Sequence, residues 1–398
     1  QALSYLSKSQ NYPSDRSLLA ETNFWKGEIY SAQESFAQAI DSYELVLKQS
    51  SAADPYFLKA TYGLGYAYFN TQDYTSAEQQ FQAYRSSQRN KNEAVFQDAL
   101  LRLGDCYFVQ KKFAQAEATF SEAIDQKVAG QDYAHLQLAV VTNYQGKNQA
   151  AVEQLNLLLA NFPTSVYLED GFFQKGQIYL EELRYEEAIT AFSELIRERP
   201  NSPYLSYALE GRAVANYSLQ RFGQTQADYK KILEEHPLAE NSEAALKGLQ
   251  EALAVQEKAE EFGEYLQTYK NANPNAGSVQ TLEYETAKNL YLSQKFPQAA
   301  KALDSYLRNY PESSQKNEAL YFAGDSYRQS GDEERAFDLF KLIEQQPASQ
   351  YRVKALQQMG NIALKREDFA EALRYFKSIE GQFRSPLDEA EVIQGMML

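Results

Sequence analysis

The chain has 398 residues and carries 39 Lys and Arg against 54 Asp and Glu, a formal net charge of −15. A chain this acidic repels phosphate backbones, which argues against nucleic-acid binding. Hydrophobic residues make up 44% of the sequence, which is enough for a core. No stretch approaches the roughly 20 apolar residues needed to span a membrane. We therefore expect a folded protein with no membrane span.

The residue types that carry metal and covalent chemistry are scarce. The one cysteine, Cys106, cannot form an intramolecular disulfide. The two histidines, His135 and His236, are about a hundred residues apart, and no pair has zinc-ligand spacing. No Ser or Cys is placed to form a catalytic triad with either histidine. The sequence predicts no metal, no cofactor and no enzymatic activity.

In chain order, the dominant signal is a repeat: an aromatic residue, a small residue three positions later, and an aromatic or leucine four positions after that. We call the small residue the anchor of its unit. The ten anchors lie on average 37 residues apart, and the seventh copy is degenerate. The anchors are Ala39, Ala77, Ala116, Ala151, Ala188, Thr225, Ala259, Ala299, Ala336 and Ala372.

A second small residue stands twelve positions before most anchors. A glycine inside a helix costs roughly 1 kcal/mol relative to alanine. Its recurrence therefore predicts that a neighbouring backbone passes too close for a side chain. These residues are Gly27, Gly65, Gly104, Ala139, Gly176, Ala213, Ala287, Gly324 and Gly360.

Apolar spacings of three and four predict two amphipathic helices in each unit, separated by a short polar turn such as 70–73. Each unit is therefore expected to be an antiparallel helix pair. Regular units are predicted over 1–237 and 282–398. Between them, 238–281 loses the registered small residues, and 271–278 has the composition of a loop. This segment is either a hinge or ordinary drift within a repeat.

Both ends of the sequence are predicted to fall inside a repeat. Ala2 lies 37 residues before Ala39, in phase with the second half of a unit. Gly395 lies 35 residues after Gly360, in phase with a first helix. We therefore expect a half repeat at each end and hypothesise that the chain is a piece of a larger protein.

One unit shows most fully the pattern that these repeats share, with Phe172, Gly176, Tyr179, Tyr185, Ala188, Phe192, Leu195 and Pro200. This pattern resembles the tetratricopeptide repeat family. The resemblance implies an all-α fold, a right-handed α-α superhelix of about ten helix-turn-helix repeats plus a half repeat at each end. The closure at Tyr310-Pro311 and the Ala-rich helix that bears Gly324 resemble the subgroup found in bacterial cell-envelope proteins, outer-membrane assembly lipoproteins and Tol–Pal coordinators. That subgroup implies a periplasmic or outer-membrane-associated location, and a cytoplasmic location stays open.

The resemblance also implies a binding face, because the first helix of each pair lines the concave groove in this family. The corresponding positions lie fifteen, eleven and eight residues before an anchor. The predicted partner-binding residues are Tyr62, Tyr66, Phe69, Asp105, Phe108, Phe173, Tyr217, Tyr284, Tyr291, Tyr321 and Asp325. Acidic residues adjoin them at Glu21, Asp98, Asp170 and Glu318. Such a face suits a basic or amphipathic peptide, although each aromatic side chain could equally pack between helices.

The sequence therefore predicts a non-catalytic scaffold that binds protein or peptide partners, as part of a bacterial cell-envelope complex. Two alternatives remain open. The array could be a self-assembling structural spacer, or it could be the regulatory region of a larger enzyme or secretion component.

Overall fold

The computed structural model describes residues 2–8, 15–87, 93–127, 129–256, 258, 261–274, 276–382 and 397. Over these residues the secondary structure is helical, and no strand occurs. The chain divides into two compact units, residues 1–204 and 205–398. No helix in the described part of the chain is long and apolar enough to cross a membrane.

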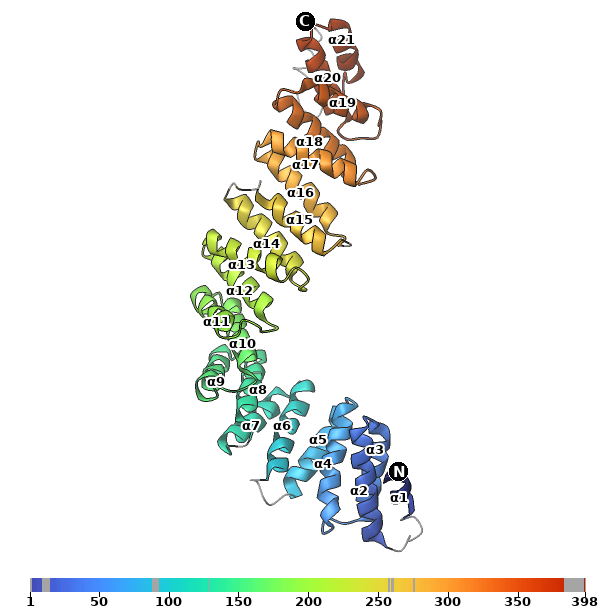
Figure 1. Ribbon diagram of the computed structural model, residues 1–398, viewed down its shortest axis with the longest axis vertical. Coiled ribbons are helices and arrows are strands. Elements are labelled where there is room, and N and C mark those ends of the chain that lie inside the picture. The colour runs from blue at the N-terminus through green and yellow to red at the C-terminus, as the bar shows by residue number, and fades with distance from the viewer. Residues whose placement is uncertain are drawn as a thin grey trace. The chain divides into compact units, whose positions relative to one another are not determined.

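The first unit contains one short helix and five helix pairs within its described residues (Figure 1). The helices are α1 (Ala2–Leu6), α2 (Arg16–Ala32), α3 (Phe36–Gln49), α4 (Pro55–Asn70), α5 (Tyr74–Ser87), α6 (Ala94–Val109), α7 (Phe113–Asp125), α8 (Gln131–Tyr144), α9 (Asn148–Asn161), α10 (Leu168–Glu181) and α11 (Tyr185–Glu198).

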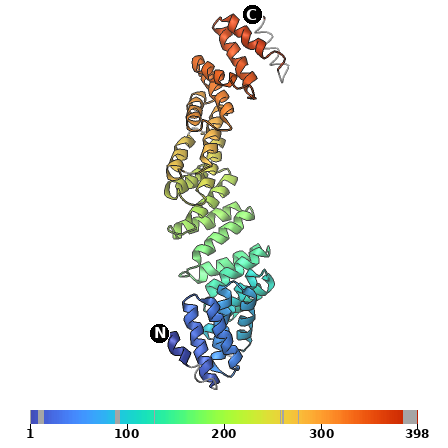
Figure 2. The ribbon, with the colours of Figure 1, turned by 90° about the vertical axis from the view of Figure 1, so that its right-hand side faces the viewer.

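The second unit contains five helix pairs within its described residues (Figure 2). The helices are α12 (Leu205–Ser218), α13 (Phe222–Glu235), α14 (Ser242–Val255), α15 (Phe262–Ala272), α16 (Val279–Leu292), α17 (Phe296–Asn309), α18 (Lys316–Gln329), α19 (Glu333–Glu344), α20 (Arg352–Lys365) and α21 (Phe369–Ser378). The prediction of an all-α fold built from about ten helix pairs is confirmed.

The predicted anchors lie in the core. Ala39, Ala77, Ala116, Ala151, Ala188, Thr225, Ala299, Ala336 and Ala372 are all between 0% and 1% exposed. The glycines twelve positions earlier face a side chain, which corrects the expectation of a close backbone. A Cβ on Gly65 would lie 2.8 Å from Cε1 of Phe81, and one on Gly176 would lie 2.5 Å from Cε1 of Phe192. The same contact recurs at Gly104, Gly324 and Gly360, each against the phenylalanine four residues after its anchor.

In every pair other than α14–α15, the turn between the two helices has the same backbone conformation. The residue five positions before the anchor has a positive φ, for example 60° at Leu183 and 87° at Gly331. The next residue then donates its N–H to a carbonyl five residues back, as Arg184 does to Tyr179 at 2.8 Å. This bond satisfies a carbonyl at the end of the first helix. The left-handed residue thus reverses the chain between the two helices.

The degenerate segment 238–281 also folds as a helix pair, α14 and α15, which pack on each other and on neighbouring helices of the second unit. The predicted loop is shorter than expected, because α15 continues to Ala272. Ala259 and Gly395 lie outside the described residues. The division into 1–237, 238–281 and 282–398 stays a prediction.

Candidate functional site

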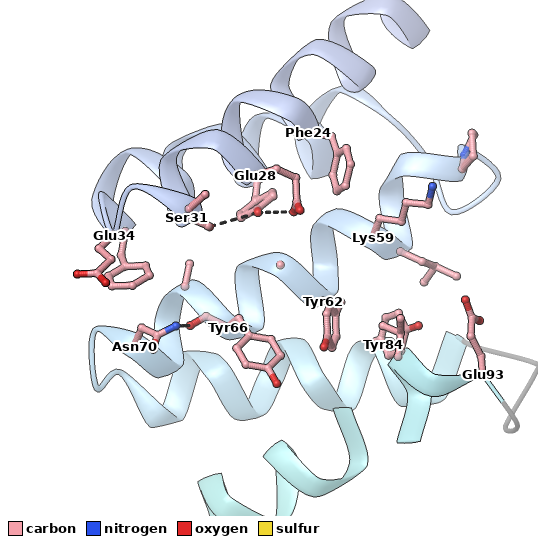
Figure 3. A pocket seen from close by; sticks show the side chains of 18 residues that line it. Phe24, Glu28, Ser31, Glu34, Lys59, Tyr62, Tyr66, Asn70, Tyr84 and Glu93 are labelled. Atoms are coloured by element: carbon pink, nitrogen blue, oxygen red, sulfur yellow. Dashed lines mark hydrogen bonds between the residues drawn. The ribbon is translucent and has the colours of Figure 1, made fainter. Parts of the chain in front are cut away.

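A cleft of about 770 Å3 lies between α2 and α4 in the first unit, and we call it the α2–α4 cleft (Figure 3). The start of α3, Tyr84 and the residues around the start of α6 complete its walls. Phe24, Glu28 and Ser31 project from α2, while Lys59, Tyr62 and Tyr66 project from α4. A volume between about 300 and 1,000 Å3 is typical of ligand sites.

Small residues leave this space open. Ala32, Gly63 and Ala67 all line the cleft, so neither helix fills it with a long side chain at these positions. Gly63 is also required by the core, because a Cβ there would lie 2.7 Å from Cζ of Tyr43. The packing of Tyr43 therefore excludes a side chain at Gly63, and this leaves part of the cleft open.

Two of the predicted binding residues, Tyr62 and Tyr66, lie in the cleft. Their rings form an edge-to-face pair with centroids 5.1 Å apart. Both hydroxyls donate to Oδ2 of Asp98, at 2.8 Å from Tyr62 and 2.5 Å from Tyr66. Burial and this carboxylate raise the pKa of both tyrosines, so both remain neutral donors at physiological pH. Asp98, which belongs to α6 of the next repeat, thus fixes the orientation of both tyrosine rings.

The opposite wall is organised by Tyr43. Its ring is 1% exposed, and its hydroxyl donates to Oε1 of Glu28 at 2.6 Å. Ser31 lies 3.3 Å from the same hydroxyl. Burial, and next the bond to Glu28, raise the pKa of Tyr43, so its proton stays in place. Tyr43, a core residue, thereby fixes the position of the Glu28 carboxylate on the cleft wall.

The ends of the cleft differ in charge. Lys59 lies toward one end, where its Nζ is 5.4 Å from the centroid of the Tyr56 ring. Asn70 and Glu34 lie toward the other end, and Glu28 stands between the two ends (Figure 3). The arrangement offers apolar ring surface, one ammonium group and exposed carboxylates within one concavity.

Phe24, Glu28 and Ser31 were not among the predicted binding residues, although their spacing in the sequence indicates the same role. They stand fifteen, eleven and eight residues before the anchor Ala39, which are the spacings used for the other units. The hydroxyl of Tyr43 had no such signal, because its position is a core position in the repeat.

Four predicted binding residues instead pack across the turn between the two helices of their own pair. Each packs on the aromatic residue that begins the second helix of its own pair, five positions later. The ring centroids are 5.3 Å apart for Phe69 and Tyr74, 5.9 Å for Phe108 and Phe113, 5.5 Å for Tyr217 and Phe222, and 5.9 Å for Tyr291 and Phe296. Their aromatic spacing across a turn was visible in the sequence.

Three more predicted residues contact neighbouring elements. Phe173 stacks on Tyr204, with centroids 4.8 Å apart, and Tyr321 stacks on Tyr351 at 5.4 Å. Tyr284 is 2% exposed and packs on Tyr306 at 5.4 Å. Tyr284 therefore belongs to the core, and the expectation of an accessible ring there was wrong.

The two predicted aspartates are buried rather than exposed. Asp105 is 7% exposed, pairs with Arg102 and accepts from Tyr133 at 2.8 Å. Burial raises the pKa of Asp105 to about 6, although Arg102 and Tyr133 oppose this shift. Asp325 is 5% exposed and accepts from Arg328 at 2.7 Å. Both side chains act inside the array.

The adjoining acids are also engaged internally. Glu21 accepts from Tyr56 at 2.7 Å, and Asp170 accepts from Tyr204 at 2.7 Å. Glu318 pairs with Lys288 at 3.2 Å, and Asp98 holds the two cleft tyrosines described above. These carboxylates connect successive repeats, and their role in partner selection stays a prediction.

The residues with metal or thiol chemistry are dispersed. No three His, Cys, Asp or Glu side chains converge as a metal site in the described part of the chain. Cys106 is buried, and that burial raises the pKa of its thiol to about 12. His135 is 5% exposed and hydrogen-bonds Gln154 through Nδ1 at 2.8 Å.

Comparison with known families finds repeat matches in the first unit and a different match in the second. Family models described as tetratricopeptide repeat match residues 26–92, 62–134 and 170–202. The YfiO family model, described as an outer membrane lipoprotein, matches residues 247–378.

A curated relative, the TPR repeat-containing protein MJ1428 of Methanocaldococcus jannaschii, is 26% identical over 227 residues. The match covers 53% of this chain, and the chain spans only 38% of the length of that relative.

Similar solved structures include the C-terminal part of a TPR repeat-containing protein from Cytophaga hutchinsonii, with a TM-score of 0.47 and 14% identity. That match covers 75% of this chain and 99% of the other. A tetratricopeptide repeat protein from Parabacteroides merdae gives a TM-score of 0.36 at 15% identity, covering 68% and 100%. With helix pairs repeated on one spacing and repeat models matching directly, this chain belongs to the tetratricopeptide repeat family.

Proposed function

We propose that this chain is a non-catalytic protein-interaction scaffold that binds an extended peptide segment of a partner in the α2–α4 cleft. The observation that carries the proposal is the cleft itself, about 770 Å3 with aromatic rings and a few charged groups on facing helices. Tetratricopeptide repeat proteins generally mediate protein–protein interaction, which agrees with such a site. Tyr62 and Tyr66 are already held in place by Asp98, so little side-chain entropy is lost when a peptide packs on them.

We further propose that the scaffold acts in a bacterial cell envelope, in the periplasm or at the outer membrane. The match of residues 247–378 to the outer membrane lipoprotein family supports this location. Fractionation of the cells that produce the protein tests it. Recovery with periplasmic or outer-membrane fractions is expected, and recovery with the cytoplasmic fraction alone would contradict the proposal.

Binding in the cleft is tested with a blocking variant. Ala32 is exposed and lines the cleft, so Ala32→Trp places an indole in the opening without disturbing the core. Ala37, exposed on α3 outside the cleft lining, provides the matched control Ala37→Trp. Peptides selected on the full chain from a random library displayed on phage should bind the Ala32→Trp variant at least about tenfold more weakly. Equal binding to both variants would overturn the cleft as the site.

A further inference from the structure

We infer that Glu28, held by Tyr43, binds a lysine or arginine side chain of the peptide segment that occupies the α2–α4 cleft. The inference rests on the proposed function and adds the residue that determines which peptide binds. It assigns Glu28 as the specificity-determining group and Tyr43 as its positioning residue.

The first observation is that Tyr43 carries a hydroxyl that its packing position does not need. Five other units have phenylalanine at the same place, four residues after the anchor: Phe81, Phe120, Phe192, Phe340 and Phe376. All six rings face the glycine of their own unit, Gly27 in the case of Tyr43. The hydroxyl of Tyr43 reaches past this contact to Glu28 at 2.6 Å. The hydroxyl therefore determines the position of Glu28 on the cleft wall.

The second observation is the room made for that hydroxyl. A Cβ on Gly63 would lie 2.9 Å from the hydroxyl oxygen of Tyr43. In the second unit, Tyr229 occupies the same repeat position, and Gly248 stands against it, with a Cβ there 2.6 Å from the hydroxyl oxygen. A glycine of the following unit thus faces the tyrosine at this position in both cases. The glycine accommodates the far end of the tyrosine ring, Cζ together with the hydroxyl, and so leaves the hydroxyl room to reach the cleft wall.

The third observation separates Glu28 from the four acids that were predicted to adjoin the binding face. Glu21, Asp98, Asp170 and Glu318 are used in bonds that join repeats. Glu28 receives its bond from a residue of its own unit and is exposed on the cleft wall. Among the described residues it forms no ion pair. Because Tyr43 holds it through one oxygen, the carboxylate is fixed and can accept a second, charged donor.

The surroundings of Glu28 suit a long cationic side chain rather than a small ion. Phe24, one turn before Glu28 on α2, and Tyr62, on the facing helix α4, line the same cleft (Figure 3). Their rings provide apolar surface for the aliphatic stem of lysine or arginine and an attractive face for its charge. Lys59, toward one end of the cleft, repels a second cation there. The expected ligand therefore has one basic residue next to an apolar residue, and an uncharged or acidic residue toward Lys59.

The experiment uses a random dodecapeptide library displayed on phage, selected on the full wild-type chain and on the Glu28→Gln chain. Lysine or arginine beside an apolar residue should be enriched on the wild type and not on Glu28→Gln. A fluorescently labelled winning peptide and its analogue with citrulline or norleucine at the basic position are then compared by anisotropy titration. The neutral analogue should bind the wild type about tenfold more weakly, and both peptides should bind Glu28→Gln equally.

Tyr43→Phe separates positioning from folding, because phenylalanine is the residue found at this position in five other units. It should weaken the charged peptide by about threefold and leave the neutral analogue unchanged. The matched control is Tyr68→Phe, which removes a hydroxyl that donates to Glu44 at 2.9 Å outside the cleft lining. The control should change neither affinity.

The outcomes distinguish the two proposals. Selected peptides that bind wild type and Ala32→Trp equally would overturn the cleft as a peptide site. If Ala32→Trp blocks binding but the charged peptide and its neutral analogue bind the wild type equally, the cleft stands as the peptide site and the assignment of Glu28 is overturned. Equal losses for charged and neutral peptides in Tyr43→Phe would show a purely structural tyrosine and overturn its positioning role.

Discussion

Gly176 and Phe192 fit each other so closely that a Cβ added to the glycine would lie 2.5 Å from Cε1 of the ring. The relationship recurs within this one chain: where the first position is glycine, the second is phenylalanine or tyrosine. Where the first is Ala287, the second is Leu303, whereas Ala213 departs from this rule because Tyr229 follows it. Apart from that unit and the degenerate unit within 238–281, the summed size of the two side chains stays nearly constant at the helix crossings, as close packing requires.

Gly176→Ala should therefore destabilise the chain by about 1–3 kcal/mol, although alanine is the better helix former. Gly223, also helical, has no atom within 4 Å of an added Cβ, so Gly223→Ala should be neutral or stabilising. Combining Gly176→Ala with Phe192→Leu should recover part of the loss. Denaturant unfolding followed by circular dichroism checks all three variants. A Gly176→Ala variant as stable as the wild type would show that the contact is loose.

Leu183→Gly should stabilise the chain by about 1 kcal/mol, because Leu183 has a φ of 60° and a left-handed conformation is costly for a side chain with a Cβ. Leu183 is 68% exposed, so little packing is lost. Gly331→Ala tests the same turn in reverse, since Gly331 has a φ of 87° and open space around it. It should destabilise by a similar amount. Thermal unfolding midpoints that move in the other direction for both variants would contradict the conformational argument.

Asp105 should give the stability a distinctive pH dependence. Its pKa is about 6 in the folded chain and 3.8 as the ordinary value, so the folded state binds the proton more readily. This group therefore favours folding below about pH 4, and that contribution is lost as the pH rises toward 6, by up to about 3 kcal/mol. Asp105→Asn removes the titration. The stability difference between wild type and variant should change between pH 4 and pH 6.5 in denaturant titrations, and a constant difference would refute the shift.

Phe69→Ala should separate stability from binding. Because Phe69 packs on Tyr74 across the turn, its loss should cost about 1–3 kcal/mol. Phe69 does not line the α2–α4 cleft, so a peptide bound there should keep its affinity at a temperature where the variant is folded. Anisotropy titration of the labelled peptide provides the measurement. A large loss of affinity would instead indicate that Phe69 contributes to peptide binding.

The periodic spacing of small residues is sufficient to predict the fold. Ala77, Ala116 and Ala188 return at the same phase as the glycines before them, and only stacked helix pairs bury such a pattern repeatedly. Binding residues were less predictable. Phe173 and Tyr62 hold the same position in their units, yet Phe173 stacks on Tyr204 while Tyr62 lines a cleft.

Sequence alone established the helix pairs, their number and the core positions at Gly65 and Phe81, because these depend on spacing within one unit. Tertiary structure decided which aromatic rings remain accessible, since that depends on the residue that the neighbouring unit places against each ring. It also decided the role of Tyr43, whose hydroxyl passes from the core to Glu28. A hydroxyl added to a core ring has no periodic signature, and its partner is known only when the two helices are in place.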